Sequence, residues 1–122
     1  MKPGETGLRR IISAAKYSYK GLQFAWKHEA AFRQELVLGL VMFPLGFWLG
    51  DSAAEKALLI GVCFITLIVE LLNTGIEAVV DRVGAEYHKL AGSAKDLGSA
   101  AVFLSLLMTI TVWGLILFEK YF

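Results

Sequence analysis

The sequence has a single cysteine, Cys63, and it lies inside a long apolar run. One cysteine cannot form a disulfide within the chain, so Cys63 is expected to be a small core residue. No group of cysteines and histidines has the spacing of a zinc site. The two histidines, His28 and His88, each lack a partner nearby in the sequence, and each is more typical of a plain interfacial residue than of a metal ligand.

The motifs of soluble nucleotide-binding proteins are also missing. There is no G-x-x-x-x-G-K-[ST] and no G-x-G-x-x-G, which excludes the standard phosphate-binding loops. The beginning of the chain is basic and contains no uninterrupted apolar stretch, so no cleaved signal peptide is expected.

What the sequence has in excess is apolar residues. They make up 57% of the 122 residues, and the mean hydropathy is +0.60. An ordinary soluble domain is less apolar, and a core of this size cannot hide so much apolar surface. We therefore expect a membrane protein with a single domain, residues 1–122.

Four helical segments follow from the pattern. Residues 8–28 alternate apolar and basic positions with helical periodicity and are too polar to span, which indicates an amphipathic helix on the membrane surface. A soluble helix packed on a partner is the alternative. Residues 30–49, 57–80 and 97–118 are each long enough to cross a bilayer core of about 30 Å. The polar stretches 50–56 and 81–95 are predicted to connect them.

The basic residues are distributed unevenly. Seven of the twelve Lys and Arg precede residue 34, three more lie at Arg82, Lys89 and Lys95, and only Lys56 and Lys120 remain for the other side. Ten against two places the N-terminus and the 81–95 loop in the cytoplasm and the C-terminus in the periplasm.

Residues 69–81 carry the most informative pattern. Their polar residues share one face of a helix whose remaining surface is apolar, and they are Glu70, Asn73, Thr74, Glu77 and Asp81. Glu70 and Glu77 are about two turns, or roughly 10 Å, apart. Ionisable groups in a spanning helix normally face a bundle interior or a wet cavity and serve a function. Alternatively, Glu77 and Asp81 are a polar helix end outside the membrane.

Several carboxylates and cations meet at the expected cytoplasmic rim. The carboxylates are Glu29, Glu77, Glu86 and Asp96, and the cations are Arg10 and Lys95. Carboxylates with few protein partners suit Mg²⁺, which keeps its waters and prefers substrate phosphates, and the cations suit phosphate oxygens. With Glu70 deeper in the membrane, this set is compatible with phosphoryl transfer onto a lipid.

The stretch Glu70-Leu-Leu-Asn-Thr-Gly-Ile-Glu-Ala-Val-Val-Asp81 resembles the signature of the prokaryotic diacylglycerol kinase family. Glu29-Ala-Ala-Phe-Arg-Gln-Glu35 and Ala94-Lys-Asp-Leu-Gly-Ser-Ala-Ala-Val102 support it. The resemblance runs from about residue 7 to residue 113. One departure is Gly75, where Ala is more usual in the family.

The resemblance implies an all-α membrane protein of the bacterial inner membrane, assembled as a homotrimer with active sites between subunits. It implies transfer of the γ-phosphoryl group of ATP, with Mg²⁺, to the hydroxyl of diacylglycerol, and no nucleic acid partner. It further implies that Glu70 is the general base, that Glu29 and Glu77 hold the metal, and that Asn73 supports them.

The resemblance also assigns the two substrate sites. The implied ATP contacts are Arg10, Tyr17, Glu29, Glu77, Glu86, Tyr87, His88, Lys95 and Asp96. The implied lipid contacts are Arg10, Ala14, Ala15, Tyr19, Gln23, Trp26, Ala31, Arg33, Gln34, Glu35, Trp48, Lys56, Glu70, Ser99 and Trp113.

Two other functions fit parts of the sequence. Undecaprenol kinases share the same signature, although Gly84-Ala-Glu-Tyr-His88 and Gly98-Ser-Ala-Ala101 look more like the diacylglycerol branch. A small proton-coupled exporter would use a lone membrane carboxylate such as Glu70. It would not need Glu29, Lys95 or Asp96 at the rim.

Overall fold

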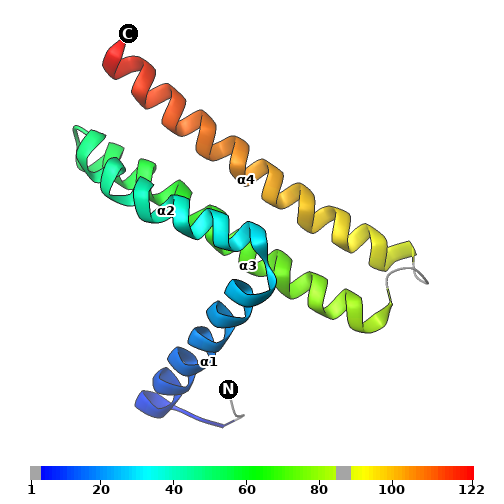
Figure 1. Ribbon diagram of the computed structural model, residues 1–122. Coiled ribbons are helices and arrows are strands. Elements are labelled where there is room, and N and C mark those ends of the chain that lie inside the picture. The colour runs from blue at the N-terminus through cyan, green and yellow to red at the C-terminus, as the bar shows by residue number, and fades with distance from the viewer. Residues whose placement is uncertain (1–3, 85–88) are drawn as a thin grey trace.

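The computed structural model describes residues 4–84 and 89–122, and these residues form four α-helices (Figure 1). They are α1 (Gly7–His28), α2 (Ala30–Leu49), α3 (Ala53–Val83) and α4 (Lys89–Tyr121). Three of them, α2, α3 and α4, are long and apolar enough to cross a membrane. The expected all-helical fold with three candidate membrane spans is therefore confirmed.

The helix α3 is the centre of the molecule. It packs against α2 on one side and α4 on the other, whereas α1 projects away from these three helices (Figure 1). Half of the described residues that are buried belong to α3, and they are Leu59, Val62, Cys63, Thr66, Glu70, Thr74 and Val80. The polar members of this set are the ones that matter for the site.

The helix α3 begins earlier than the sequence pattern predicted. The expected connection 50–56 is reduced to Gly50, Asp51 and Ser52, because Ser52 Oγ accepts the backbone N–H of Glu55 at 3.1 Å and caps the helix. The Glu55 carboxylate accepts the backbone N–H of Asp51 at 3.0 Å. These reciprocal bonds resemble a capping box and satisfy N–H groups that would otherwise lack partners.

The connection between α3 and α4 is also shorter than predicted. Gly84 caps the C-terminus of α3, and its N–H donates to Val80 O at 2.9 Å. Its φ of 92° lies in the left-handed region, which favours glycine. The next described residue, Lys89, already begins α4. The polar residues 89–96, predicted as a connection, are thus the first turns of a helix, since a helix can continue into water beyond its apolar stretch.

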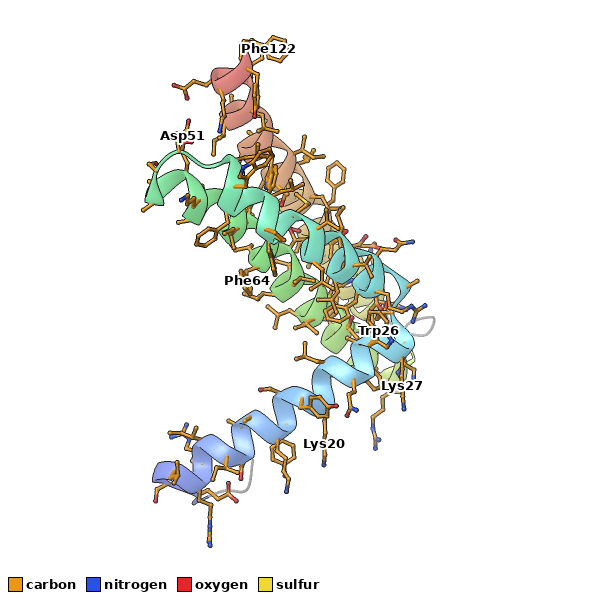
Figure 2. The ribbon with its side chains drawn as sticks, turned by 60° about the vertical axis from the view of Figure 1, so that its left-hand side comes forward. Lys20, Trp26, Lys27, Asp51, Phe64 and Phe122 are labelled. Carbon is orange, nitrogen blue, oxygen red and sulfur yellow. The ribbon has the colours of Figure 1, made fainter. Side chains whose placement is uncertain are left out.

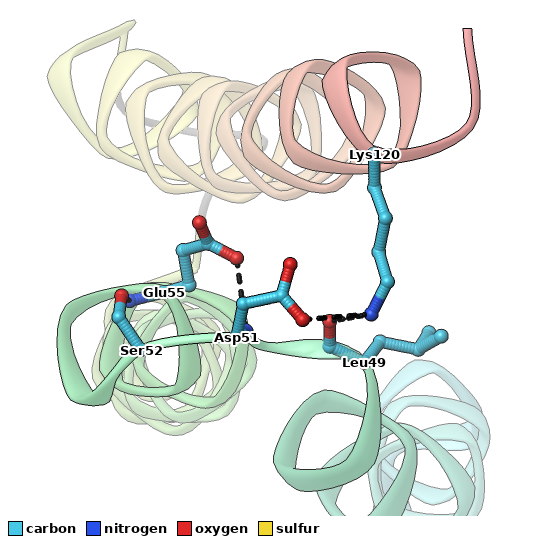
Figure 3. A network of polar contacts seen from close by, with 5 residues as sticks. All are labelled: Leu49, Asp51, Ser52, Glu55 and Lys120. Atoms are coloured by element: carbon cyan, nitrogen blue, oxygen red, sulfur yellow. Dashed lines mark hydrogen bonds and ion pairs between the residues drawn. The ribbon is translucent and has the colours of Figure 1, made fainter.

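A polar clamp joins the other end of the bundle (Figure 3). The Lys120 ammonium of α4 donates to the carbonyl oxygen of Leu49 at 2.7 Å and contacts Asp51 Oδ1 at 3.1 Å. Leu49 is the last residue of α2, so its carbonyl has no partner within the helix. The clamp therefore ties α4 to the turn between α2 and α3.

The helix α1 is largely exposed, and Ala25 is its one buried residue. Lys20 and Lys27 project to the same side of it, away from the bundle (Figure 2). A single extended residue, Glu29 (φ −122°, ψ 107°), separates α1 from α2. This abrupt change of direction sets the angle at which α1 leaves the bundle.

Candidate functional site

The first feature of the site is a pair of carboxylates from different elements. Glu29, at the junction of α1 and α2, lies beside Glu77 of α3. Burial raises the pKa of Glu29 above its ordinary value of 4.5, and the neighbouring Glu77 carboxylate raises it further. The structure therefore brings together the two residues that the resemblance assigns to a metal. Their like negative charges repel each other.

Asn73 holds one of these carboxylates. Its side-chain nitrogen donates to Glu77 Oε1 at 3.2 Å, one turn along the same helix. Its side-chain oxygen is buried and has no hydrogen-bond partner among the described residues. The bond to Oε1 restricts the rotation of Glu77, and the supporting role expected of Asn73 stays a prediction.

Glu70 lies about two turns deeper along α3, roughly 10 Å from Glu77. Its side chain is only 3% exposed. Three other carboxylates, Glu35, Glu29 and Glu77, act on it electrostatically. It is therefore a buried acid inside a group of negative charges, a placement that is costly unless a cation or a proton compensates it.

A cavity of about 300 Å³ opens between α2, α3 and α4. Apolar side chains make most of its wall, and Glu35, Thr66, Thr109 and Trp113 supply its polar groups. Thr66 Oγ1 and Thr109 Oγ1 are 3.0 Å apart, and Trp113 Nε1 donates to Leu59 O at 3.0 Å. Two residues implied as lipid contacts, Glu35 and Trp113, therefore share one cavity.

At the same end of α3 as Glu77, Lys95 of α4 is paired with Asp81. Their charged atoms are 3.0 Å apart, and both side chains are partly exposed. Asp81 was predicted only as a polar helix end or a further group on the Glu70 face. In the structure it forms an ion pair with Lys95, one of the residues implied to contact the nucleotide.

Arg33 has a structural role that the sequence did not indicate. Its Nη1 donates to the carbonyl oxygens of Trp26 at 2.7 Å and Lys27 at 3.3 Å, in the last turn of α1. These carbonyls have no partners within the helix. Arg33, implied as a lipid contact, therefore braces the junction that carries Glu29.

Some of the expected site residues lie far from the rim within one chain. Arg10 is eighteen residues before the end of α1, about 27 Å along the helix axis, and Tyr17 is about 16 Å away. Trp48 lies at the opposite end of α2, about 27 Å from its start, and Lys56 lies near the start of α3. These four residues do not meet Glu29 and Glu77 in a single copy.

The side chains of the remaining assigned residues make no hydrogen bond or ion pair with a described residue. On α1 and the start of α2 these are Ala14, Ala15, Tyr19, Gln23, Trp26, Ala31 and Gln34, and on α4 they are Asp96 and Ser99. Asp96 and Ser99 are exposed. Glu86, Tyr87 and His88 lie outside the described residues.

Three residues of the site were not predicted as site residues from the sequence. Thr109 and Cys63 line the cavity, and Gly98 lies against Asn73. Thr109 is far from Thr66 in sequence and Gly98 is far from Asn73, so only the packing of α4 on α3 brings them together. The small residues at 98–101 were the one available signal, since they predict close helix contact.

The donor set fits a hard divalent cation better than a transition metal. Among residues 4–84 and 89–122, no group of three or more His, Cys, Asp and Glu residues is arranged to hold a metal ion. The two carboxylates of Glu29 and Glu77 match the few protein ligands that Mg²⁺ takes when phosphates and waters complete its shell.

Known proteins resemble this chain over nearly its whole length. A family model described as prokaryotic diacylglycerol kinase matches residues 16–117. A diacylglycerol kinase of Escherichia coli (strain K12) is 48% identical over 121 residues, which cover 99% of each chain. A diacylglycerol kinase of Pseudomonas aeruginosa is 51% identical over 114 residues and 93% of each chain. One of Haemophilus influenzae is 48% identical over 113 residues, 93% of this chain and 96% of that one.

Proposed function

The chain belongs to the prokaryotic diacylglycerol kinase family, and from this we propose that it is a membrane-spanning lipid kinase. It transfers the γ-phosphoryl group of ATP to the free hydroxyl of diacylglycerol, giving phosphatidate and ADP. The observation that carries the proposal is the placement of a buried Glu70 about two turns below the paired carboxylates of Glu29 and Glu77. One carboxylate is deep enough for a lipid hydroxyl, and the pair lies where phosphates can arrive from water.

Glu29 and Glu77 would hold Mg²⁺ together with the ATP phosphates. When bound, the ion neutralises charge on the phosphates and helps to align them, which is most of what phosphoryl transfer requires. Burial and then the Glu77 carboxylate raise the pKa of Glu29, and a bound ion would compensate the negative charges of both residues. Asn73 keeps Glu77 in place through its 3.2 Å hydrogen bond.

Glu70 acts as the general base. It accepts the proton of the diacylglycerol hydroxyl as that oxygen attacks the γ-phosphorus and the bond to ADP breaks. The hydroxyl of diacylglycerol stays near the headgroup level because the acyl chains anchor it. It can therefore meet Glu70 within the membrane. The cavity beside Glu35 and Trp113 offers apolar walls for part of the lipid, with Glu35 at its polar side.

The nucleotide site would be completed by a second copy of the chain. Lys95, held by Asp81, can contact phosphate oxygens. Arg10 and Tyr17 are too far along α1 to reach the same nucleotide from their own chain. The apolar span of α4 has almost no fully buried residues in one copy of the chain, and such a surface suits helix contacts between copies. Both features support the homotrimer with active sites between subunits.

The protein is a bacterial membrane protein by its relatives and its three apolar helices. We place it in the inner membrane with the N-terminus cytoplasmic and the C-terminus periplasmic, because ten of twelve basic residues fall on one side. In this orientation the amphipathic α1 lies on the cytoplasmic membrane surface, and Glu29 and Glu77 face the ATP of the cytoplasm.

The test is a kinase assay with purified protein and ATP labelled at the γ-phosphate. Diacylglycerol and undecaprenol are offered side by side in the same mixed micelles. We expect label in phosphatidate at a rate well above that in undecaprenyl phosphate. Preferential labelling of undecaprenol would make the chain an undecaprenol kinase, and no labelled lipid would contradict the proposed function.

A further inference from the structure

One glycine of α4, Gly98, is buried directly against Asn73 of α3. A Cβ atom built at Gly98 would overlap the Asn73 side-chain oxygen and would lie 3.2 Å from Asn73 Cγ. Gly92 and Gly114 of the same helix differ, because a Cβ at either position meets no atom within 4 Å. A side chain at Gly98 would therefore force the Asn73 carboxamide to move, whereas one at Gly92 or Gly114 would meet open space.

The contact fixes the orientation of the Asn73 carboxamide. Its oxygen is buried next to Gly98 without a hydrogen-bond partner among the described residues, and its nitrogen faces Glu77 Oε1. The reverse orientation would turn the carbonyl dipole toward the Glu77 carboxylate. An unpartnered buried oxygen is unfavourable, so close packing and the bond to Glu77 together must hold it there.

We propose that Gly98 is a positioning residue for the divalent cation site. It leaves the space that the Asn73 carboxamide occupies, and Asn73 in turn holds Glu77 Oε1 and so restricts the position of the Glu77 carboxylate beside Glu29. This proposal depends on the metal-binding role of Glu77 in the proposed function. A methyl group at Gly98 would displace the Asn73 side chain and release Glu77. Losing the partner behind a metal ligand typically weakens metal binding about tenfold to a hundredfold.

The experiment measures Mn²⁺ binding directly, by the EPR signal of free Mn²⁺, with purified protein and a non-hydrolysable ATP analogue. We expect Gly98→Ala to weaken Mn²⁺ binding about tenfold or more and Gly92→Ala to leave it unchanged. In turnover assays, Gly98→Ala should raise the Mg²⁺ concentration needed for half-maximal rate more than it lowers the rate at saturating Mg²⁺.

A double variant separates positioning from general packing. Once Asn73→Ala has removed the carboxamide, adding Gly98→Ala should cause no further loss of Mn²⁺ binding. Equal losses in both backgrounds, or wild-type binding by Gly98→Ala, would contradict the proposal. If Gly98→Ala alone fails to fold, Asn73→Ala must restore folding, and a double variant that also fails to fold contradicts it as well.

Glu77→Gln distinguishes this inference from the function on which it rests. If Glu77→Gln loses Mn²⁺ binding while Gly98→Ala binds normally, only the positioning role of Gly98 is wrong. If Glu77→Gln itself binds Mn²⁺ like the wild type, the metal-binding role of Glu77 is wrong.

Discussion

Glu29, from the junction of α1 and α2, and Glu77, from α3, lie side by side. Burial and then the Glu77 carboxylate raise the pKa of Glu29, while His28 and Arg33 act weakly in the opposite direction. Two acids held together in this way make a site that gains from a cation. They also make the folded protein sensitive to pH.

The first prediction concerns that pH dependence, without divalent cations. Because the folded pKa of Glu29 is raised, its contribution to stability is complete below the ordinary value of 4.5 and is lost as the pH rises through the folded value. Glu29→Gln removes the titration. We therefore expect this variant to unfold at a higher temperature than the wild type at neutral pH, and at the same temperature below pH 4.5.

Two controls accompany this measurement. Glu119→Gln removes an exposed carboxylate at the far end of α4 and should change the unfolding temperature little at any pH. Adding Mg²⁺ with an ATP analogue should stabilise the wild type and reverse its disadvantage against Glu29→Gln. A Glu29→Gln variant that is less stable than the wild type at neutral pH would contradict the repulsive pair.

The second prediction concerns the clamp of Lys120. We expect Lys120→Met to lower the free energy of unfolding in detergent by about 1–2 kcal/mol, because it removes a charged hydrogen bond to the Leu49 carbonyl. Asp51→Asn removes only the partly exposed ion pair and should cost about 0–1 kcal/mol. Equal losses in the two variants would assign the stabilisation to the ion pair instead.

The third prediction concerns Arg33 and the direction of α1. Arg33→Ala leaves the carbonyls of Trp26 and Lys27 without their cap, so α1 should adopt a wider range of angles. Spin labels at Lys16 and Val83, in a Cys63→Ala background diluted with unlabelled protein, should give a broader distance distribution. Gln34→Ala, at the exposed neighbouring position, should not broaden it. An unchanged distribution in Arg33→Ala would mean that other contacts hold the junction.

The sequence predicted helix existence and type well, because long apolar runs and basic flanks are local signals. It predicted the ends of α3 and α4 less well. The capping bonds of Ser52 and Glu55 begin α3 within a stretch that looked like a polar loop, and residues 89–96 look equally polar whether they are helical or not. Polar residues indicate exposure to water, and they occur both in loops and at the ends of helices. Polarity alone therefore does not locate the end of a helix.

The sequence predicted which residues share a helix face, and it did not predict which residues of different helices are in contact. The shared face of Glu70, Asn73 and Glu77 follows from helical periodicity alone. The bonds of Arg33 to α1 and of Lys95 to Asp81, and the packing of Gly98 on Asn73, join residues whose proximity depends on how the helices pack. Without an account of that packing, Arg33 and Gly98 could not be given their roles.

The fourth prediction concerns orientation in the membrane. In a Cys63→Ala background, a cysteine at Asp51 should react with an impermeant thiol reagent applied to intact cells freed of their outer membrane. A cysteine at Lys89 should react only after the inner membrane is permeabilised. Reaction of both cysteines from the same side would contradict the three-span arrangement, and an exchange of the two results would reverse the orientation.

The fifth prediction concerns Glu70 as the base. Glu70→Gln keeps the size and one hydrogen-bonding oxygen of the side chain but cannot accept the proton of the lipid hydroxyl. General bases typically contribute about 10²–10⁴-fold to the rate, so the turnover number should fall by at least about a hundredfold. Glu70→Asp should fall between the wild type and Glu70→Gln, because its carboxylate is shorter by one methylene.

The most direct measurement is the turnover number of Glu70→Gln at saturating ATP, Mg²⁺ and diacylglycerol, compared with that of Glu77→Gln. We predict that both variants are severely slowed. Mn²⁺ binding in the presence of the ATP analogue should be retained by Glu70→Gln and weakened in Glu77→Gln. If Glu70→Gln turned over within a fewfold of the wild type while Glu77→Gln was crippled, the assignment of Glu70 as the base would be contradicted.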